Sequence, residues 1–193
     1  MTARKGSVRI IGGQHRGRRL AFTDQNGDLR PTGDRLRETL FNWLQPHLPG
    51  ARVLDLFAGS GALAAEALSR GAGYATVVEK KRERAADLSR QLKPIFAGSV
   101  FVQCADAMKW LERAGDDSRI APFDLVFVDP PYDTALQGAA CARLVSQGLL
   151  APGALVYVES ARHGLVPEVP AGWLLRKDKE GGDVRAQLYE VPA

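Results

Sequence analysis

Short apolar runs alternate with amphipathic segments along most of this 193-residue chain. Each apolar run has the length of a buried strand, and the runs cover residues 52–57, 74–79, 99–103, 123–128 and 154–159. Apolar residues recur at helical spacing in the segments that follow them, over residues 61–70, 81–93, 106–113 and 134–147. Strands that alternate with helices predict an α/β fold, in which a mostly parallel sheet is covered by helices on both faces.

Both ends of the chain depart from this alternation. Residues 8–11 and 18–22 predict two short strands around a Gly-rich turn, and residues 36–44 then predict an amphipathic helix that stops at Pro46. Residues 173–179 and 183–190 are strand-like and flank a Gly-Gly turn, which predicts an antiparallel hairpin. We therefore expect an N-terminal arm with a β-hairpin over residues 1–30 and an α/β domain over residues 31–193.

Positive charge is concentrated near the N-terminus. Residues 1–37 hold nine Arg or Lys against three Asp, a net charge of +6, so the rest of a chain with net charge +4 sums to −2. The first twenty residues contain no acid and six basic side chains: Arg4, Lys5, Arg9, Arg16, Arg18 and Arg19. A basic arm on a near-neutral body indicates a polyanionic partner, with a solvated and partly disordered tail as the alternative.

Several classes of protein are disfavoured by the composition. No run of 18 or more apolar residues occurs, and no apolar stretch follows the basic N-terminus, so we expect neither a membrane span nor a secretory signal. Cys104 and Cys141 are isolated, which favours the reducing cytoplasm over a disulfide framework or a zinc site. No metal-ligand pattern is formed by the three histidines, His15, His47 and His163.

A glycine-rich loop follows the first strand of the α/β region. Gly59-x-Gly61-x-x-Ala64 matches the fingerprint of nucleotide-binding loops, and Glu79 ends the next strand, 24 residues after Asp55. The glycines allow close approach of the backbone to a ligand, and the second acid can accept hydrogen bonds from both ribose hydroxyls. This pattern fits NAD as well as S-adenosylmethionine. A surface acid within the charged run 79–83 is the alternative for Glu79.

Asp55 separates the two cofactors. Its carboxylate stands at the strand tip, where a pyrophosphate would sit on the helix N-terminus, and two anions there would repel each other. S-adenosylmethionine carries an ammonium and a sulfonium instead, so we predict this cofactor; a capping acid is the alternative for Asp55. Asp106 follows the third strand and can accept from the adenine amino group, although the same residue also fits a helix N-cap.

The tetrapeptide Asp129-Pro130-Pro131-Tyr132 follows the fourth apolar run. The lone pair of an exocyclic base amine is delocalised, so the amine attacks only when acceptors hold its hydrogens and aim the lone pair. The Asp129 carboxylate and the Pro130 carbonyl can be those acceptors, with the prolines fixing their positions. Tyr132 can stack on an everted base, and Asp129 can take the proton late in the transfer. A plain turn is the alternative for this sequence.

These motifs together resemble the RsmD-type bacterial methyltransferases, which act on guanine N2 in small-subunit ribosomal RNA. The resemblance covers nearly the whole chain, and its most specific stretches are residues 8–13 with 16–20, 30–42, 53–63 and 129–132. It implies a class I S-adenosylmethionine-dependent methyltransferase fold, with a Rossmann-like seven-stranded sheet and a small N-terminal β-hairpin. The chain departs from the family in a short extension over residues 1–7, in Gly33 and in the polar segment after Gly115.

The resemblance also implies the residues of the site. The amine would be held by Asp129, Pro130 and Tyr132. The cofactor would contact Asp55, Phe57, Ala58, Gly59, Ser60, Gly61, Glu79, Lys80, Asp106, Ala107 and Asp129. From the basic charge of the N-terminal segment we expect RNA contacts at Arg9, Arg16, Arg18, Arg19, Arg30, Thr32 and Arg35. The Arg30-Pro31-Thr32 segment could lie at the edge of the cofactor site, contact RNA phosphate, or begin the helix with Thr32 or Asp34 as its cap. We favour the position at the edge of the cofactor site.

The leading hypothesis is therefore a cytoplasmic, monomeric enzyme that methylates guanine N2 of 16S ribosomal RNA within the small subunit or an assembly intermediate. A methyltransferase of adenine or cytosine amines in DNA is one alternative, although the chain has little spare length for a target-recognition region. A nicotinamide-dependent oxidoreductase is another, and Asp55 argues against it. A non-catalytic RNA-binding assembly factor is the third.

Overall fold

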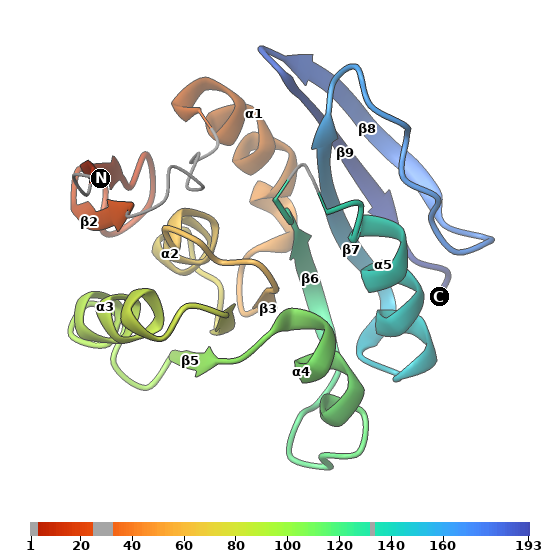
Figure 1. Ribbon diagram of the computed structural model, residues 1–193, viewed down its shortest axis with the longest axis horizontal. Coiled ribbons are helices and arrows are strands. Elements are labelled where there is room, and N and C mark those ends of the chain that lie inside the picture. Colours follow the sequence, from red (N-terminus) through yellow and green to blue (C-terminus); the bar gives the residue numbers. More distant parts are fainter. Residues whose placement is uncertain (1–3, 25–32, 132–133) are drawn as a thin grey trace. The chain divides into compact units, whose positions relative to one another are not determined.

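The computed structural model describes residues 4–24, 33–131 and 134–193, and it divides into two compact units, Met1–Ala105 and Asp106–Ala193 (Figure 1). The first unit comprises β1 (Arg4–Arg9), β2 (Arg19–Asp24), α1 (Asp34–Leu44), the 3-10 helix η1 (Gln45–His47), β3 (Arg52–Asp55), α2 (Ala62–Ser69), β4 (Tyr74–Glu79), α3 (Arg82–Leu92) and β5 (Val100–Cys104). The second comprises α4 (Ala107–Ala114), β6 (Phe123–Val128), α5 (Gln137–Ser146), β7 (Leu150–Ala161), β8 (Leu174–Gly181) and β9 (Val184–Glu190).

The strands form a seven-stranded sheet in the order β5-β4-β3-β6-β7-β9-β8, and β1 and β2 form a separate two-stranded sheet. Within the first unit β3 pairs with β4, and β4 with β5, in parallel. Within the second unit β6 and β7 are parallel, whereas β9 is antiparallel to both β7 and β8. The predicted α/β class is confirmed, including the N-terminal hairpin and the antiparallel C-terminal pair.

The N-terminal hairpin is longer than the apolar pattern predicted. Its strands pair antiparallel from Arg4 opposite Asp24 to Arg9 opposite Arg19, rather than over residues 8–11 and 18–22. The short extension over residues 1–7 therefore contributes four of the six residues of β1. Gly6 lies opposite Phe22 and leaves room for its ring, because a side chain at this position would overlap the aromatic carbons. Cross-strand pairing, rather than local hydrophobicity, sets these strand ends.

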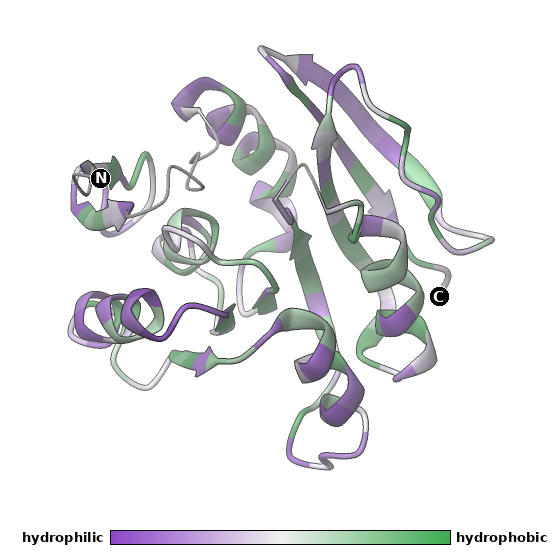
Figure 2. Cartoon of the chain, in the orientation of Figure 1, coloured by the Kyte–Doolittle hydropathy of each residue, from purple (hydrophilic) through white to green (hydrophobic). Residues whose placement is uncertain are grey.

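The core is built from the strands that the apolar runs predicted. Figure 2 shows hydrophobic residues along β6 and β7 and hydrophilic ones along α3 and the outer strand β8. The β6 residue Phe127 is fully buried and meets Tyr157 of β7 edge-on, with 6.1 Å between ring centroids. In the first unit every residue of α2 is buried, and its many alanines allow close packing. Glu66 is the one acidic residue in this helix.

Among residues 4–24, 33–131 and 134–193, no helix has the length and hydropathy needed to cross a membrane. Both cysteines are free thiols: Cys104 is exposed at the end of β5, and Cys141 is buried in α5, where burial raises its pKa to about 12.

Candidate active site

The glycine-rich loop turns from β3 into α2 through two left-handed residues. Gly59 has φ of 53° and Gly61, the N-cap residue of α2, has φ of 72°, a region that side chains disfavour. The Gly61 N–H donates to the Ala58 carbonyl at 2.7 Å, and the Ala58 N–H donates to Val78 of β4 at 3.0 Å. A Cβ at Gly61 would lie 2.6 Å from a methyl group of Leu88, so α3 holds the loop closely. Both the positive φ and the contact with Leu88 favour glycine at position 61.

Asp55 lies at the carboxyl end of β3 with only 2% of its surface exposed. Its Oδ2 accepts the N–H of Ala64 in the first turn of α2 at 3.1 Å. The capping role that was the alternative for Asp55 is thus present, and it leaves further acceptor capacity on the carboxylate. Burial, opposed by the Ala64 hydrogen bond and assisted by the charge of Glu79, raises the Asp55 pKa to about 7. A cation beside this group would favour its ionised form.

Glu79 ends β4 and is also buried, which makes the surface-acid alternative wrong. Its Oε2 accepts the Gly59 N–H at 3.1 Å, and its Oε1 accepts the Lys81 N–H at 2.7 Å. Arg84 of α3 lies 3.7 Å from Oε2 and partly balances the charge. The carboxylate therefore ties the glycine loop to the start of α3, and its orientation is fixed before any ligand arrives.

The remaining residues predicted to contact the cofactor in this unit differ in their exposure. Ala58 and Ser60 are buried, whereas Phe57 and Lys80 are respectively half-buried and exposed. The first unit therefore brings two buried carboxylates and a closely turned backbone loop to the carboxyl ends of β3 and β4. Such an arrangement can bind a cationic, ribose-bearing ligand, and it opposes a pyrophosphate.

In the second unit, Asp106 precedes α4 as its N-cap. Its Oδ1 accepts the N–H groups of Met108 and Lys109, at 3.1 and 3.3 Å. Capping was the alternative that did not exclude a cofactor contact, and the structure shows it directly. Ala107, the first residue of the helix, is buried.

Asp129 is the first residue after β6, in the position that the apolar run predicted. It is half-buried, Pro130 is buried, and Pro131 is exposed. The Thr134 N–H and hydroxyl both donate to the Pro131 carbonyl, at 3.1 and 2.6 Å. Tyr132, the predicted stacking residue, lies outside the described residues.

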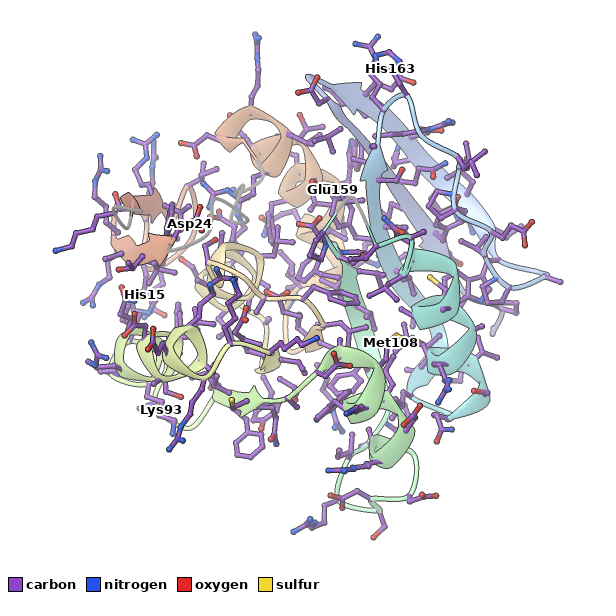
Figure 3. All side chains as sticks on the ribbon, viewed as in Figure 1. His15, Asp24, Lys93, Met108, Glu159 and His163 are labelled. Carbon is purple, nitrogen blue, oxygen red and sulfur yellow. The ribbon has the colours of Figure 1, made fainter. Side chains whose placement is uncertain are left out.

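Two features beside this loop were not predicted. Ala135 has φ of 47°, the single non-glycine residue with positive φ in the described ranges, and such strain often accompanies functional loops. Gln137, the first residue of α5, donates to the Glu159 carbonyl at 3.1 Å. The buried carboxylate of Glu159, which Figure 3 labels, accepts from the Tyr157 hydroxyl at 2.7 Å. Glu159 ends the apolar part of β7, and a lone acid there was the available signal.

The predicted RNA-binding arginines of the hairpin are exposed. Arg9 lies 3.7 Å from Asp34, and Arg19 donates to Ser7 at 2.9 Å. Arg16 and Arg18 form no ion pair with any described residue. The hairpin gathers these side chains in one short segment, which disfavours the disordered-tail alternative.

The segment from 30 to 37 is only partly described. Arg30 and Thr32 lie outside the described residues, and Arg35 is exposed on α1. Arg37, which was not singled out, is almost fully buried; its guanidinium donates to the Arg9 carbonyl at 2.9 Å and to Asp34 at 2.7 Å. An arginine at a buried position of an amphipathic helix is the sequence signal that could have revealed it.

Known proteins resemble this chain over nearly its full length. Residues 8–190 match the family model described as conserved hypothetical protein 95. The ribosomal RNA small subunit methyltransferase D of Escherichia coli is 46% identical, with 97% of this chain and 92% of the relative covered. A solved structure named "Putative methyltransferase yhhF from Escherichia coli" superimposes with a TM-score of 0.85 at 43% identity, covering 97% of this chain and 99% of the other.

A more distant structure agrees in fold alone. "A putative sam-dependent methyltransferase from Streptococcus mutans" has a TM-score of 0.68 at 15% identity, with 90% of this chain and 53% of the other covered. The α/β sheet with its antiparallel end is therefore shared with proteins whose sequences have diverged widely.

Proposed function

Because the chain belongs to the family described as conserved hypothetical protein 95, the RsmD-type family that its motifs predicted, we propose that it methylates ribosomal RNA. Specifically, it transfers a methyl group from S-adenosylmethionine to the exocyclic N2 amine of a guanine in 16S ribosomal RNA, in the small subunit or an assembly intermediate. The name of the E. coli relative supports the substrate class. A ribosomal substrate also supports the cytoplasmic location that the cysteines predicted.

The observation that carries the choice of cofactor is the pair of buried carboxylates beside the glycine loop. Asp55 and Glu79 are 2% and 6% exposed, and the Arg84 guanidinium lies 3.7 Å from the Glu79 carboxylate. A pyrophosphate placed there would meet negative charge, whereas the ammonium of S-adenosylmethionine would be attracted. Glu79, although it already accepts two backbone N–H groups, keeps lone pairs for ribose hydroxyls.

The proposed cofactor contacts are residues at the ends of the parallel strands and in the segments that follow them, taken for each unit by itself. From the first unit they are Asp55, Phe57, Ala58, Gly59, Ser60, Gly61, Glu79 and Lys80. From the second they are Asp106, Ala107 and Asp129. When bound, S-adenosylmethionine supplies an electrophilic methyl group.

The second unit holds the amine. The Asp129 carboxylate and the Pro130 carbonyl accept its two hydrogens, so its lone pair is aimed rather than spread over the ring. Pro131 and the turn to Thr134 restrict the backbone at this point. Because the bond from the methyl carbon to sulfur breaks as the C–N bond forms, the cofactor would leave as S-adenosylhomocysteine and the nitrogen would carry an extra proton, which Asp129 would accept and pass to water. Tyr132 stacks on the everted guanine.

A pair of substitutions at Asp129 tests the reaction. Asp129→Ala and Asp129→Asn should each abolish methyl transfer to small subunits isolated from a strain that lacks the gene, while S-adenosylmethionine binding by calorimetry stays within a few-fold of wild type. Nucleoside mass spectrometry identifies the product as N2-methylguanosine. Wild-type turnover in either variant, or a methylated adenine or cytosine as the product, would contradict the proposal.

The same assays separate the competing hypotheses. Duplex DNA offered as substrate tests an amino methyltransferase of DNA, and a calorimetric titration with NAD tests the oxidoreductase. Tight RNA binding by the wild-type protein without any methyl transfer would support the non-catalytic assembly factor instead.

A further inference from the structure

The loop between β1 and β2, residues 10–18, is bound to α2 through the buried carboxylate of Glu66. Glu66 has no exposed surface, and its Oε2 accepts the N–H of Ile11 at 2.7 Å while its Oε1 accepts the N–H of Gly12 at 2.8 Å. Arg70, one turn further along α2, donates its Nε to Oε1 at 2.7 Å. A buried carboxylate is tolerated only with such partners, and here two of its three hydrogen bonds go to the arm loop.

Two of the three glycines of this loop, Gly12 and Gly13, lie against the end of α2. Gly13 has φ of 75°, and a side chain on it would overlap the Ser69 carbonyl oxygen. A Cβ on Gly12 would lie 2.6 Å from the Arg70 guanidinium. The Gly-Gly pair of the N-terminal motif thus permits the backbone to touch the last turn of α2.

Ser69, the last residue of α2, forms three further hydrogen bonds with the loop. The Gln14 N–H donates to its carbonyl at 2.7 Å, the His15 N–H donates to its hydroxyl at 2.9 Å, and that hydroxyl donates to the Gly12 carbonyl at 2.6 Å. The His15 ring then meets Phe96, just after α3, edge-on with centroids 4.9 Å apart (Figure 3). The next residues, from Arg16 to Arg19, include three exposed arginines.

The far strand of the hairpin is held by a second helix. The side-chain amide of Gln91 in α3 accepts the Ala21 N–H at 2.6 Å and donates to the Ala21 carbonyl at 2.8 Å. The hairpin lies beside α2 and α3 in Figure 1. Both helices begin at the proposed cofactor loops, α2 directly after Gly61 and α3 three residues after Glu79. The hairpin therefore contacts α2 and α3, the two helices that follow the proposed cofactor-binding loops.

We propose that Glu66 is a positioning residue for RNA recognition: its carboxylate fixes the arm loop on α2 so that Arg16, Arg18 and Arg19 meet the RNA backbone in one orientation. This inference rests on the proposed function. An apolar residue would suit the interior of α2 as well, since every other residue of that helix except Ser69 is Ala or Leu. The carboxylate is explained by the two arm amides that it binds.

Glu66→Gln is the sharpest test, because the amide keeps one acceptor but turns an NH₂ group toward N–H donors. Hydrogen exchange at Ile11, Gly12, Gln14 and His15 should accelerate, while exchange in β3 and β4 stays as in wild type. KM for small subunits should rise about tenfold or more, as the loss of a charge-assisted hydrogen bond implies. The kcat at saturating substrate and the Kd for S-adenosylmethionine should stay within about twofold.

Two further variants keep the test decisive. Gly13→Ala disturbs the same contact between the loop and α2, but the substitution lies in the loop and leaves the sequence of α2 unchanged. It should therefore raise KM in the same way even if Glu66→Gln folds poorly. Glu112→Gln is the matched control: this glutamate forms an exposed 2.9 Å ion pair with Arg143 in the second unit, and its loss should change neither KM nor exchange in the arm.

A double-mutant cycle distinguishes positioning from simple stabilisation. If Glu66 positions the arginines, Arg16→Ala should weaken RNA binding in the wild type but much less in the Glu66→Gln background. Additive effects, an unchanged KM, or a Kd for S-adenosylmethionine that rises in parallel with KM would overturn the inference. Failure of the proposed function is seen separately, because the wild type would then make no N2-methylguanosine in 16S ribosomal RNA.

Discussion

Replacing Asp55 with asparagine should separate the stability of the protein from its affinity for the cofactor. The carboxyl is 2% exposed, and burial raises its pKa from 3.8 to about 7. The unfolded chain therefore releases this proton near pH 4, whereas the folded protein keeps it until about pH 7. Between these values the unfolded state binds fewer protons, so the contribution of Asp55 to stability falls as pH rises.

The size of the effect follows from the pKa difference. A rise of about three units corresponds to roughly 4 kcal/mol at about 1.4 kcal/mol per unit, and this is an upper bound for the cost of the buried charge above pH 7. Asparagine removes the charge and keeps an oxygen for the Ala64 N–H. The stability of Asp55→Asn relative to wild type should therefore grow from pH 4 to pH 7 and level off above it.

Urea unfolding of the ligand-free proteins at pH 4.5, 6, 7 and 8, at constant ionic strength, measures this difference directly. The other titrating groups are common to both proteins, so most of their contributions cancel in the comparison. A difference in unfolding free energy that is independent of pH would refute the reasoning, because it would mean that Asp55 ionises as it does in the unfolded chain.

Cofactor binding should show the opposite trend. A cationic ligand binds the ionised carboxylate, so wild-type affinity for S-adenosylmethionine should increase as pH rises toward 7 and then become constant. Near pH 6, calorimetry in buffers of different ionisation enthalpy should detect the release of up to about one proton on binding. Asp55→Asn should bind the cofactor weakly at every pH, and its binding should release no proton from this position.

Three further predictions concern single positions. Gly61→Ala should destabilise the protein by about 1–2 kcal/mol in urea unfolding, because alanine at φ of 72° is strained and its Cβ meets Leu88; unchanged stability would show that the turn can relax. Phe127→Ala should cost about 3–5 kcal/mol, and a loss below about 1 kcal/mol would mean that the cavity beside Tyr157 collapses without cost. Arg18→Ala should lower the slope of log affinity for RNA against log salt by about one unit; an unchanged slope would remove Arg18 from the phosphate contacts.

The sequence predicted the elements of the central sheet because their signal is local. An apolar run of about four to six residues marks a buried strand directly, and the run over residues 74–79 stops at Glu79, the acid that ends β4. The run over residues 52–57 extends two residues beyond Asp55, where β3 ends. Boundaries were less accurate where pairing decides them. β7 begins at Leu150 rather than 154 because Leu150 lies opposite Phe123 on β6, a contact that no local pattern reveals.

The attachments of the arm could not be predicted for a related reason. Glu66 is separated from Ile11 and Gly12 by 55 and 54 residues, and Gln91 from Ala21 by 70. Hydrophobic periodicity says which face of a helix is buried, but it does not say which backbone amide a buried acid will bind. A charged residue in an otherwise apolar helix signals only that some partner must exist.

The bond between Gln91 and Ala21 also protects the arm from other chains. A two-stranded hairpin presents unpaired N–H and C=O groups along its outer edge, and such an edge invites strand addition and aggregation. The Gln91 amide occupies both groups of Ala21, near the middle of β2, as a neighbouring peptide would. The side chain thus occupies this edge of β2 at Ala21 and opposes the addition of a further strand there.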